Sequence, residues 1–274
     1  MQPTLSTQIQ RLEAEVGVQL FHRTKRIVRL TEAGRVFLEE ARLALEHSEQ
    51  AVREARRVAS GETGRLAVGL VGSATYGALT EVLGLYRERF PEMQLAPREI
   101  NTANQIEALR EGSIQVGFLR PHSDFDPDDL EIKAFIREPM MAVLPKNHHL
   151  SALKAVPLEA LAEEPFVLLA REREPGFYEQ VVRACQEAGF VLRVAQEVTE
   201  MQVGLGLGAA GAYVGLLPAS TRHIKMTGVV FKKLAKPVPK MTLYIAWRRG
   251  NLPPVARAFL DLAEEVAGRQ TVRS

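Results

Sequence analysis

The stretch that decides the fold is residues 2–21, QPTLSTQIQRLEAEVGVQLF. Pro3 suits the first turn of a helix, and Leu5, Ile9 and Leu12 recur at spacings of four and three. This periodicity predicts a helix with one apolar stripe, ended by Gly17. The opposite face offers side chains that can hydrogen-bond bases or phosphates, namely Thr4, Thr7, Gln8 and Arg11.

A cationic segment follows. Residues 23–30, RTKRIVRL, alternate Arg or Lys with apolar residues, which predicts a two-stranded hairpin with positively charged tips. Residues 1–30 hold five cations (Arg11, Arg23, Lys25, Arg26, Arg29) against Glu13 and Glu15, a local excess that suits a polyanion. Each piece alone could be an amphipathic helix or a solvated edge hairpin. In this order they indicate the second half of a winged helix-turn-helix.

A long helix is predicted next, over residues 31–60. Thr31 is a suitable N-cap, and no Gly or Pro interrupts residues 35–60. Small and apolar residues recur at alternating spacings of four and three, at Phe37, Ala41, Ala44, Ser48, Ala51, Ala55 and Val58. This heptad seam favours dimerisation over packing on the helix's own domain. Residues 60–64, SGETG, would end the helix as a hinge.

These residues carry a family resemblance. Gln2-Pro3-Thr4-Leu5-Ser6, Ile9, Leu12-Glu13, Gly17 to Phe21, Arg23, and Leu30 to Gly34 resemble the signature of LysR-type transcriptional regulators. The resemblance implies contacts to promoter DNA from Gln2, Pro3, Thr4, Ser6, Thr7, Gln8 and Arg11, and contacts mainly to phosphates from Arg23, Lys25 and Arg26. It also implies a homodimer or tetramer and leaves a contact with RNA polymerase open.

The resemblance includes one departure. Family members have two helices before the Gln-Pro-Ser/Thr stretch, whereas Met1 stands directly before it here. We expect on the order of 20 further upstream residues, without which Leu5, Ile9 and Leu12 lack packing partners and DNA binding is incomplete. A start codon assigned too far downstream and a truncation both explain this. We hypothesise the former, and the intact mass of the native protein tests it.

Residues 65–274 read as α/β. Strand-like runs lie near 65–71, 93–100, 114–119, 139–144, 166–170, 190–195, 212–217 and 242–247, with a helix before Pro91 and others near 102–111, 157–163, 176–189, 200–210 and 253–267. The alternation predicts mainly parallel sheets. The resemblance implies a two-lobed, periplasmic-binding-protein-like (type 2) effector domain after regions 1–30 and 31–60. Lobe I would be about 65–137 and 241–274, and lobe II about 138–240, with crossovers near Pro139, Pro237 and Pro239.

A candidate effector site follows from strand ends. Ser73-Ala74-Thr75 and Asn101-Thr102 stand at predicted helix starts, where free N–H groups favour a carboxylate. Arg120 follows the next strand, and Phe177 would add an apolar wall from the other lobe. Simple helix capping is the alternative for Ser73 or Thr102 taken alone. Residues 69–73, Thr102 with Gln105, 117–120 and 217–220 resemble the muconate- and benzoate-responsive members, which implies that Ser73 and Thr102 contact an inducer carboxylate.

Other functions are less well supported. Residues 206–211, GLGAAG, match a dinucleotide motif, but they lie at the end of a predicted helix, and residues 226–240 hold no Asp or Glu. We therefore expect no enzyme, no cofactor and no metal; Cys185 is the only cysteine, and His148-His149 read as loop residues. A free solute-binding protein and a sensor-only dimerising regulator remain alternatives. Without a secretion signal or an 18-residue apolar run, we expect a cytoplasmic protein with no membrane partner.

Overall fold

The computed structural model describes residues 5–23, 28–60, 64–250 and 252–272 of the 274-residue chain. The chain divides into two compact units, Met1–Ala59 and Ser60–Ser274, which are described separately. Among the described helices, none combines the length and the apolar character needed to cross a bilayer.

The first unit has the helix, hairpin and long helix that the sequence predicts. Helix α1 (Leu5–Val16) is followed by Gly17 at φ +79°, a left-handed conformation that ends the helix. Strands β1 (Phe21–Arg23) and β2 (Val28–Leu30) pair antiparallel, with Phe21 opposite Leu30. Helix α2 (Glu32–Ser60) then runs for 29 residues.

Polar contacts join these elements. The Glu13 carboxylate accepts hydrogen bonds from the backbone N–H groups of Leu20 (2.9 Å) and Phe21 (3.0 Å), which fixes β1 against α1. The Thr31 hydroxyl caps α2 by accepting from the N–H of Gly34 at 2.8 Å, as predicted. Gly34 packs so closely on the Leu20 carbonyl that a Cβ would not fit. The hairpin is therefore held between the two helices through backbone contacts.

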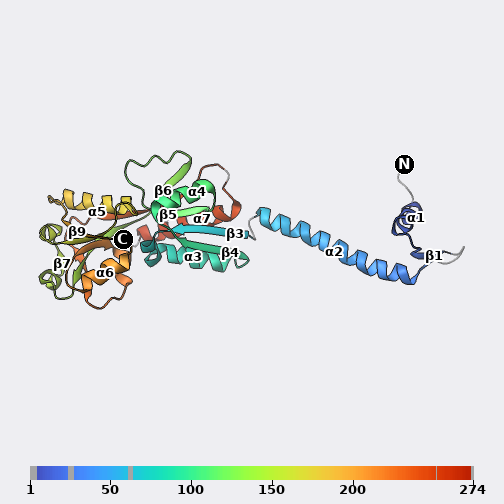
Figure 1. Ribbon diagram of the computed structural model, residues 1–274, viewed down its shortest axis with the longest axis horizontal. Helices are drawn as coiled ribbons and strands as arrows, with labels where there is room; N and C mark the ends of the chain where they lie inside the picture. Colours follow the sequence, from blue (N-terminus) through green and yellow to red (C-terminus); the bar gives the residue numbers. More distant parts are fainter. Residues whose placement is uncertain (1–4, 24–27, 61–63, 251, 273–274) are drawn as a thin grey trace. The chain divides into compact units, whose positions relative to one another are not determined.

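The second unit begins with lobe I. Strands β3 (Gly64–Leu70), β4 (Met93–Glu99) and β5 (Val116–Leu119) are parallel, in the order β4-β3-β5. Leu66, Val68 and Leu70 face one core with α3 (Ala78–Arg89) and α7 (Pro254–Val272), and Ala67 faces another with α4 (Thr102–Glu111). Figure 1 shows α3 and α4 on opposite sides of these strands. Successive side chains of β3 alternate between two covered faces, which explains its nearly continuous apolar run.

Lobe II has its own core. Strands β8 (Phe166–Leu169) and β9 (Val194–Val198) pair in parallel, and α5 (Pro175–Glu187) and α6 (Met201–Ala209) pack with them. Strands β7 (Ala155–Val156), β10 (Gly215–Pro218) and β11 (Val229–Leu234) complete the lobe with short 3-10 helices η2 (His149–Ala152), η3 (Leu158–Leu161) and η4 (Ala219–His223). Phe166, Phe177 and Val181 are among its most deeply buried side chains.

Two antiparallel strands connect the lobes. Strand β6 (Leu130–Pro145) places Phe135 in the lobe I core and Met140 in the lobe II core. Strand β12 (Lys240–Arg248) places Met241 in lobe II and Leu243 in lobe I. Lys240 lies opposite Pro139. The chain thus passes between lobes twice, at neighbouring points on one pair of strands.

Several sequence predictions are wrong in detail. The sheets are mixed, because β12, β10 and β11 all pair antiparallel with β6, so the expectation of mainly parallel strands fails. The strand predicted at 190–195 is β9 at Val194–Val198, and the helix at 157–163 is only the 3-10 turn Leu158–Leu161. The first half of β6 and all of β7 and β11 were not predicted. The first half of β6 and the strand β11 include charged residues and lack a long apolar run, and β7 has only two residues, too few to show a pattern.

Gly176 provides a test of the contact between lobes. It lies in α5 against the carbonyl oxygens of Arg120 and Pro121, where an added Cβ would overlap both. We expect Gly176→Ala to lower the free energy of unfolding by about 1–3 kcal/mol because backbone must move to admit the methyl group. Urea unfolding of the purified chain measures this.

Gly84→Ala is the matched control. Gly84 lies on an exposed turn of α3 with no atom near the position of an added Cβ. This substitution should raise stability by about 0.5–1 kcal/mol, since Ala favours a helix over Gly. Equal effects of the two substitutions would contradict the close packing at Gly176.

Candidate functional site

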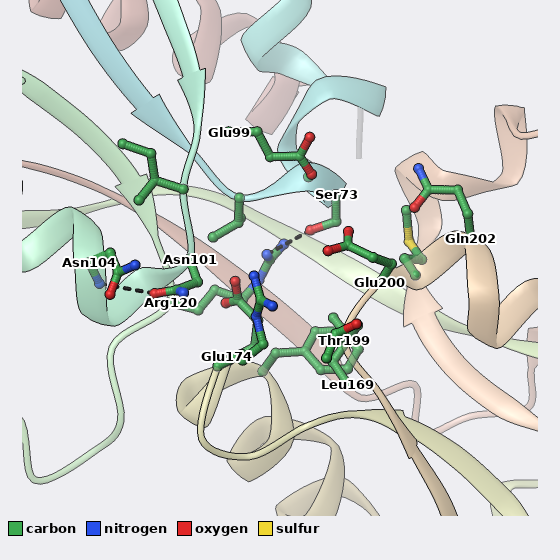
Figure 2. A pocket seen from close by; sticks show the side chains of 16 residues that line it. Ser73, Glu99, Asn101, Asn104, Arg120, Leu169, Glu174, Thr199, Glu200 and Gln202 are labelled. Carbon is green, nitrogen blue, oxygen red and sulfur yellow. Dashed lines mark hydrogen bonds between the residues drawn. The ribbon is translucent and has the colours of Figure 1, made fainter.

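A cleft of about 330 Å³ opens between the two lobes. Lobe I lines it with residues at the ends of β3, β4 and β5, and lobe II lines it with residues after β8 and β9. The lining residues are Val71, Gly72, Ser73, Glu99, Ile100, Asn101, Asn104, Arg120, Leu169, Arg173, Glu174, Phe177, Thr199, Glu200, Met201 and Gln202. Figure 2 shows most of their polar side chains gathered around the same space.

Ser73 lines the cleft and accepts a hydrogen bond from the guanidinium Nη1 of Arg120 at 2.8 Å. The prediction that residues 73–75 begin the α-helix is wrong, because they belong to a 3-10 helix, η1 (Gly72–Tyr76), and α3 starts only at Ala78. Ala74 is buried in the lobe I core, and the exposed Thr75 donates to the Gly72 carbonyl. Ala74 and Thr75 are not among the lining residues.

Asn101 and Thr102 lie at the start of α4 but have different surroundings. Asn101 lines the cleft, and its side chain accepts from the N–H of Asn104, so it caps the helix. Thr102 is only 1% exposed and is not among the lining residues. Its hydroxyl donates to Glu174 Oε2 at 3.0 Å and accepts from the Arg120 N–H at 3.2 Å. The capping alternative is therefore wrong for both Ser73 and Thr102, because Asn101 caps α4 and no side chain caps η1. Thr102 instead joins the two lobes through its hydrogen bond to Glu174.

Arg120 is the buried cation of the cleft. Its side chain is 2% exposed, and the Nε–H is a buried donor without a hydrogen-bond partner. Burial lowers the pKa of the guanidinium, while the carboxylates of Glu174 and Glu138 oppose this shift. Arginine remains charged even so. A charged donor with unused capacity at the edge of a cleft favours an acceptor-bearing ligand.

Glu174 is the buried acid opposite Arg120, and sequence reasoning missed it. Burial raises its pKa to about 6, against the opposing effects of the Arg120 charge and the Thr102 hydrogen bond. Glu174 immediately precedes α5, and the predicted apolar wall, Phe177, follows in its first turn and is 2% exposed. In the sequence, Glu174 belongs to the charged run RERE, which reads as a solvated loop.

Three further charged residues at the cleft were also missed. Glu99 ends β4, Arg173 precedes α5, and Glu200 stands directly before α6; all three are exposed. Figure 2 shows Glu200 turned toward Ser73 and Arg120 from lobe II. Glu99 stands at a strand end and Glu200 at a helix start. These are the same kinds of position that led to the prediction of Ser73 and Asn101.

The predicted DNA-contact residues lie on the first unit. Ser6, Gln8 and Arg11 are exposed on α1, and Thr7 is half-buried. Leu5 and Leu12 of the apolar stripe are 72% and 36% exposed. Gln2, Pro3, Thr4, Lys25 and Arg26 lie outside the described residues, as does the side chain of Arg23, whose backbone ends β1.

The predicted seam of α2 is mostly exposed in the single chain. Phe37 and Ala41 are half-buried, and Ala44, Ser48 and Ala51 are exposed; the side chains of Ala55 and Val58 lie outside the described part. Leu38, Leu45 and Val52 were overlooked, although they repeat every seven residues and are 37%, 67% and 49% exposed. With Ala41 and Ser48 they form a bulkier heptad stripe than the predicted one.

Two other groups lie outside the cleft. Gly206 and Gly208 lie within α6, and Gly211 has φ +89° after it, so the glycine motif marks a helix end, as expected. His148, His149 and Glu164 come together, which the sequence did not predict. The Nδ1 atom of His148 accepts from the Leu150 N–H, and its Nε2 lies 3.2 Å from Glu164 Oε1. That tautomer directs a proton, rather than a lone pair, at the carboxylate.

Comparisons with known proteins agree with this architecture. The family model described as "LysR substrate binding domain" matches residues 59–268, and "Bacterial regulatory helix-turn-helix protein, lysR family" matches residues 1–35. The transcriptional regulator AlsR of Bacillus subtilis is 37% identical over 262 residues, which cover 96% of this chain and 86% of AlsR. BenM of Acinetobacter baylyi is 35% identical, over 90% of this chain and 81% of BenM.

Solved structures show the same similarity. Full-length CbnR in complex with its target DNA matches with a TM-score of 0.83 at 27% identity, covering 96% of this chain and 88% of that one. The BenM effector-binding domain with its effector benzoate matches with a TM-score of 0.67 at 28% identity, covering 76% of this chain and 93% of that one.

Glu174→Gln tests the buried acid. Because the pKa of Glu174 rises from 4.5 to about 6 on folding, its ionisation opposes folding above pH 6, and the penalty disappears below pH 4.5. Between pH 7.5 and pH 4.5 the wild type should therefore gain about 2 kcal/mol relative to the variant. Urea unfolding of both proteins at the two pH values measures it. If the wild type and the variant differ in free energy of unfolding by the same amount at both pH values, the raised pKa of Glu174 is contradicted.

Proposed function

Since the chain belongs to the family of LysR-type transcriptional regulators, we propose that it binds promoter DNA under the control of a small carboxylate held between its two lobes. The observation that supports the carboxylate is Arg120, buried at the cleft with Ser73 on its Nη1 and an unpaired Nε–H. A guanidinium recognises a carboxylate through short, charge-assisted hydrogen bonds. The Ser73 hydroxyl adds a second polar group at the same place.

The first compounds to test come from a similarity. BenM has benzoate as its effector, and the sequence stretches at 69–73 and 117–120 resemble the benzoate- and muconate-responsive members. An aromatic-catabolism metabolite such as benzoate or cis,cis-muconate is therefore the starting hypothesis for the inducer. AlsR is more similar in sequence than BenM, so the subgroup rests on the cleft residues rather than on overall identity.

DNA binding is proposed through the first unit. Helix α1 exposes Ser6, Gln8 and Arg11, and the hairpin adds the cations Arg23, Lys25 and Arg26 beside it in the sequence. CbnR, which shares the fold, is solved with its target DNA. In the proposed arrangement α1 enters the major groove and the hairpin lies on phosphates.

Dimerisation is proposed through α2. Leu38, Leu45 and Val52 expose apolar surface at heptad spacing, next to the small residues Ala41 and Ser48. A second copy of the helix would bury this stripe and place two α1 helices on a nearly palindromic site. Pairing of dimers into tetramers would follow from further contacts between effector domains.

The proposed mechanism couples the cleft to DNA by lobe closure. The ligand would bridge lobe I and lobe II and thereby favour one closure of the effector domains, and with it one spacing of the DNA-binding heads. We infer that the chain catalyses no reaction, because its family and the relatives described above are regulators. The regulator is also favoured over a free solute-binding protein, because the helix-turn-helix family model matches residues 1–35.

Calorimetric titration of benzoate and cis,cis-muconate tests the sensor. We expect saturable binding that Ser73→Ala weakens about tenfold, because a hydrogen bond to a charged group is lost. Thr102→Ala should also weaken it, because Thr102 holds both Arg120 and Glu174. Thr75→Ala is the control, since Thr75 is exposed outside the cleft. Equal weakening by all three variants would contradict the site.

Arg26→Ala tests the hairpin. If Arg26 contacts phosphate, the variant should bind specific and scrambled duplexes more weakly by the same factor, and the slope of log affinity against log salt should fall by about one. Fluorescence anisotropy at several salt concentrations measures both, with Arg42→Ala on the exposed surface of α2 as the control. A loss confined to one DNA sequence would instead assign Arg26 to base recognition.

A further inference from the structure

The charges that line the cleft do not match those of a simple carboxylate. Two cations, Arg120 and Arg173, line it together with three acids, Glu99, Glu174 and Glu200. Arg120 and Glu174 are both buried and offset each other, as the mutual effects on their pKa values show. Three charged residues are exposed at the cleft: the acids Glu99 on lobe I and Glu200 on lobe II, and the cation Arg173 on lobe II, so the acids exceed the cations by one.

These two carboxylates have unused hydrogen-bonding capacity. Neither forms a side-chain hydrogen bond or an ion pair with another residue in the described part of the chain. The Glu99 carboxylate lies against Gly72, next to Ser73 in the chain, where an added Cβ would be 2.5 Å from its Oε1. Glu200 turns toward the same space from the other lobe (Figure 2). Ionised carboxylates only accept hydrogen bonds, so they require donors.

Arg120, which lines the same cleft, requires a hydrogen-bond acceptor rather than a donor. Its guanidinium is 2% exposed, donates to Ser73 and retains an unpartnered Nε–H. A donor of this kind requires an acceptor. The cleft therefore presents donors at Arg120 and carboxylate acceptors at Glu99 and Glu200, and a ligand that bears acceptors alone satisfies only the donors.

Closure of the two lobes would raise the electrostatic cost of binding a ligand that has no donors. Bringing Glu99 and Glu200 closer to each other and to a ligand without donors adds like-charge repulsion, and the cost rises as water leaves the cleft. A dicarboxylate would add a further negative charge. A ligand that places an ammonium or a hydroxyl between the two acids would instead offset the repulsion and favour the closed form.

We propose that the effector is a small carboxylic acid that also carries a hydrogen-bond donor, an ammonium or a hydroxyl group, with the carboxylate on Arg120 and Ser73 and the donor between Glu99 and Glu200. This proposal rests on the proposed sensor function and narrows its ligand class. It ranks benzoate and muconate below donor-bearing acids, because these two have no donor beyond the carboxyl group.

Matched acids test the proposal by calorimetry on the full chain. Three sets differ only at the carbon next to the carboxyl group: acetate, glycolate and glycine; 3-methylbutanoate, 2-hydroxy-3-methylbutanoate and valine; phenylacetate, mandelate and phenylglycine. We expect at least one donor-bearing member to bind tenfold or more tightly than the plain acid of its set. Plain acids that bind as tightly as their donor-bearing counterparts would overturn the proposal.

Charge variants then locate the donor. Glu200→Gln and Glu99→Gln should each reduce the preference for the donor-bearing acid at least threefold, more for an ammonium than for a hydroxyl, because glutamine keeps an acceptor oxygen but loses the charge. Glu197→Gln is the control, since Glu197 is exposed on β9 and is not among the lining residues. A preference that survives in the Glu99→Gln/Glu200→Gln double variant would overturn the assignment.

The outcomes also separate this proposal from the sensor itself. Benzoate or muconate that binds more tightly than every donor-bearing acid, with binding weakened by Ser73→Ala, would overturn the donor requirement and support the carboxylate sensor. Failure of every acid to bind a demonstrably folded chain would overturn both.

Discussion

Burial of the Arg120 guanidinium is the constraint on which the cleft depends. A buried charge is costly unless other groups hydrogen-bond to it and balance it, and here these groups come from separate elements. Ser73, after β3, accepts from the guanidinium, and Glu174, before α5 on the other lobe, balances its charge. Thr102, at the start of α4, accepts from the backbone N–H of Arg120 and donates to Glu174. The three cannot reach Arg120 unless the strand order β4-β3-β5 and the contact of lobe II with lobe I are both in place. The network therefore specifies the relation of the lobes as well as the ligand site.

The same network explains how a ligand could influence the rest of the domain. Thr102 donates to Glu174 across the junction between the lobes, and Gly176 packs against the backbone that follows β5. In the described part of the chain the lobes are connected through β6 and β12, whose crossing points lie opposite each other at Pro139 and Lys240. A ligand that competes for Arg120 would change the balance between Arg120 and Glu174, and the paired strands would allow the lobes to respond together.

The sequence predicted the elements better than it predicted their pairing. Leu66 to Leu70 and the helix start at Asn101 carry strong local signals, and they lie where expected. The antiparallel pairing of β6 with β12 joins residues about a hundred positions apart, which no local pattern encodes. Glu174 illustrates the limit at the site, since a glutamate in the run RERE becomes buried only because α5 packs on lobe I. Thr102 lies at the start of α4, as predicted, but its hydroxyl hydrogen-bonds Glu174 and the Arg120 N–H instead of facing the cleft.

Similarity to relatives identifies the architecture and leaves the effector open for a physical reason. At 35–37% identity, BenM and AlsR resemble this chain over most of its length, but specificity is a difference in affinity that a few groups in contact with the ligand determine. Arg120 and Ser73 would accept almost any carboxylate. Under the proposal, Glu99 and Glu200 would not, because each lacks a donor partner in the described chain and the two line the cleft from different lobes. In the proposed site, discrimination among carboxylates would therefore depend on the acids Glu99 and Glu200 more than on Arg120.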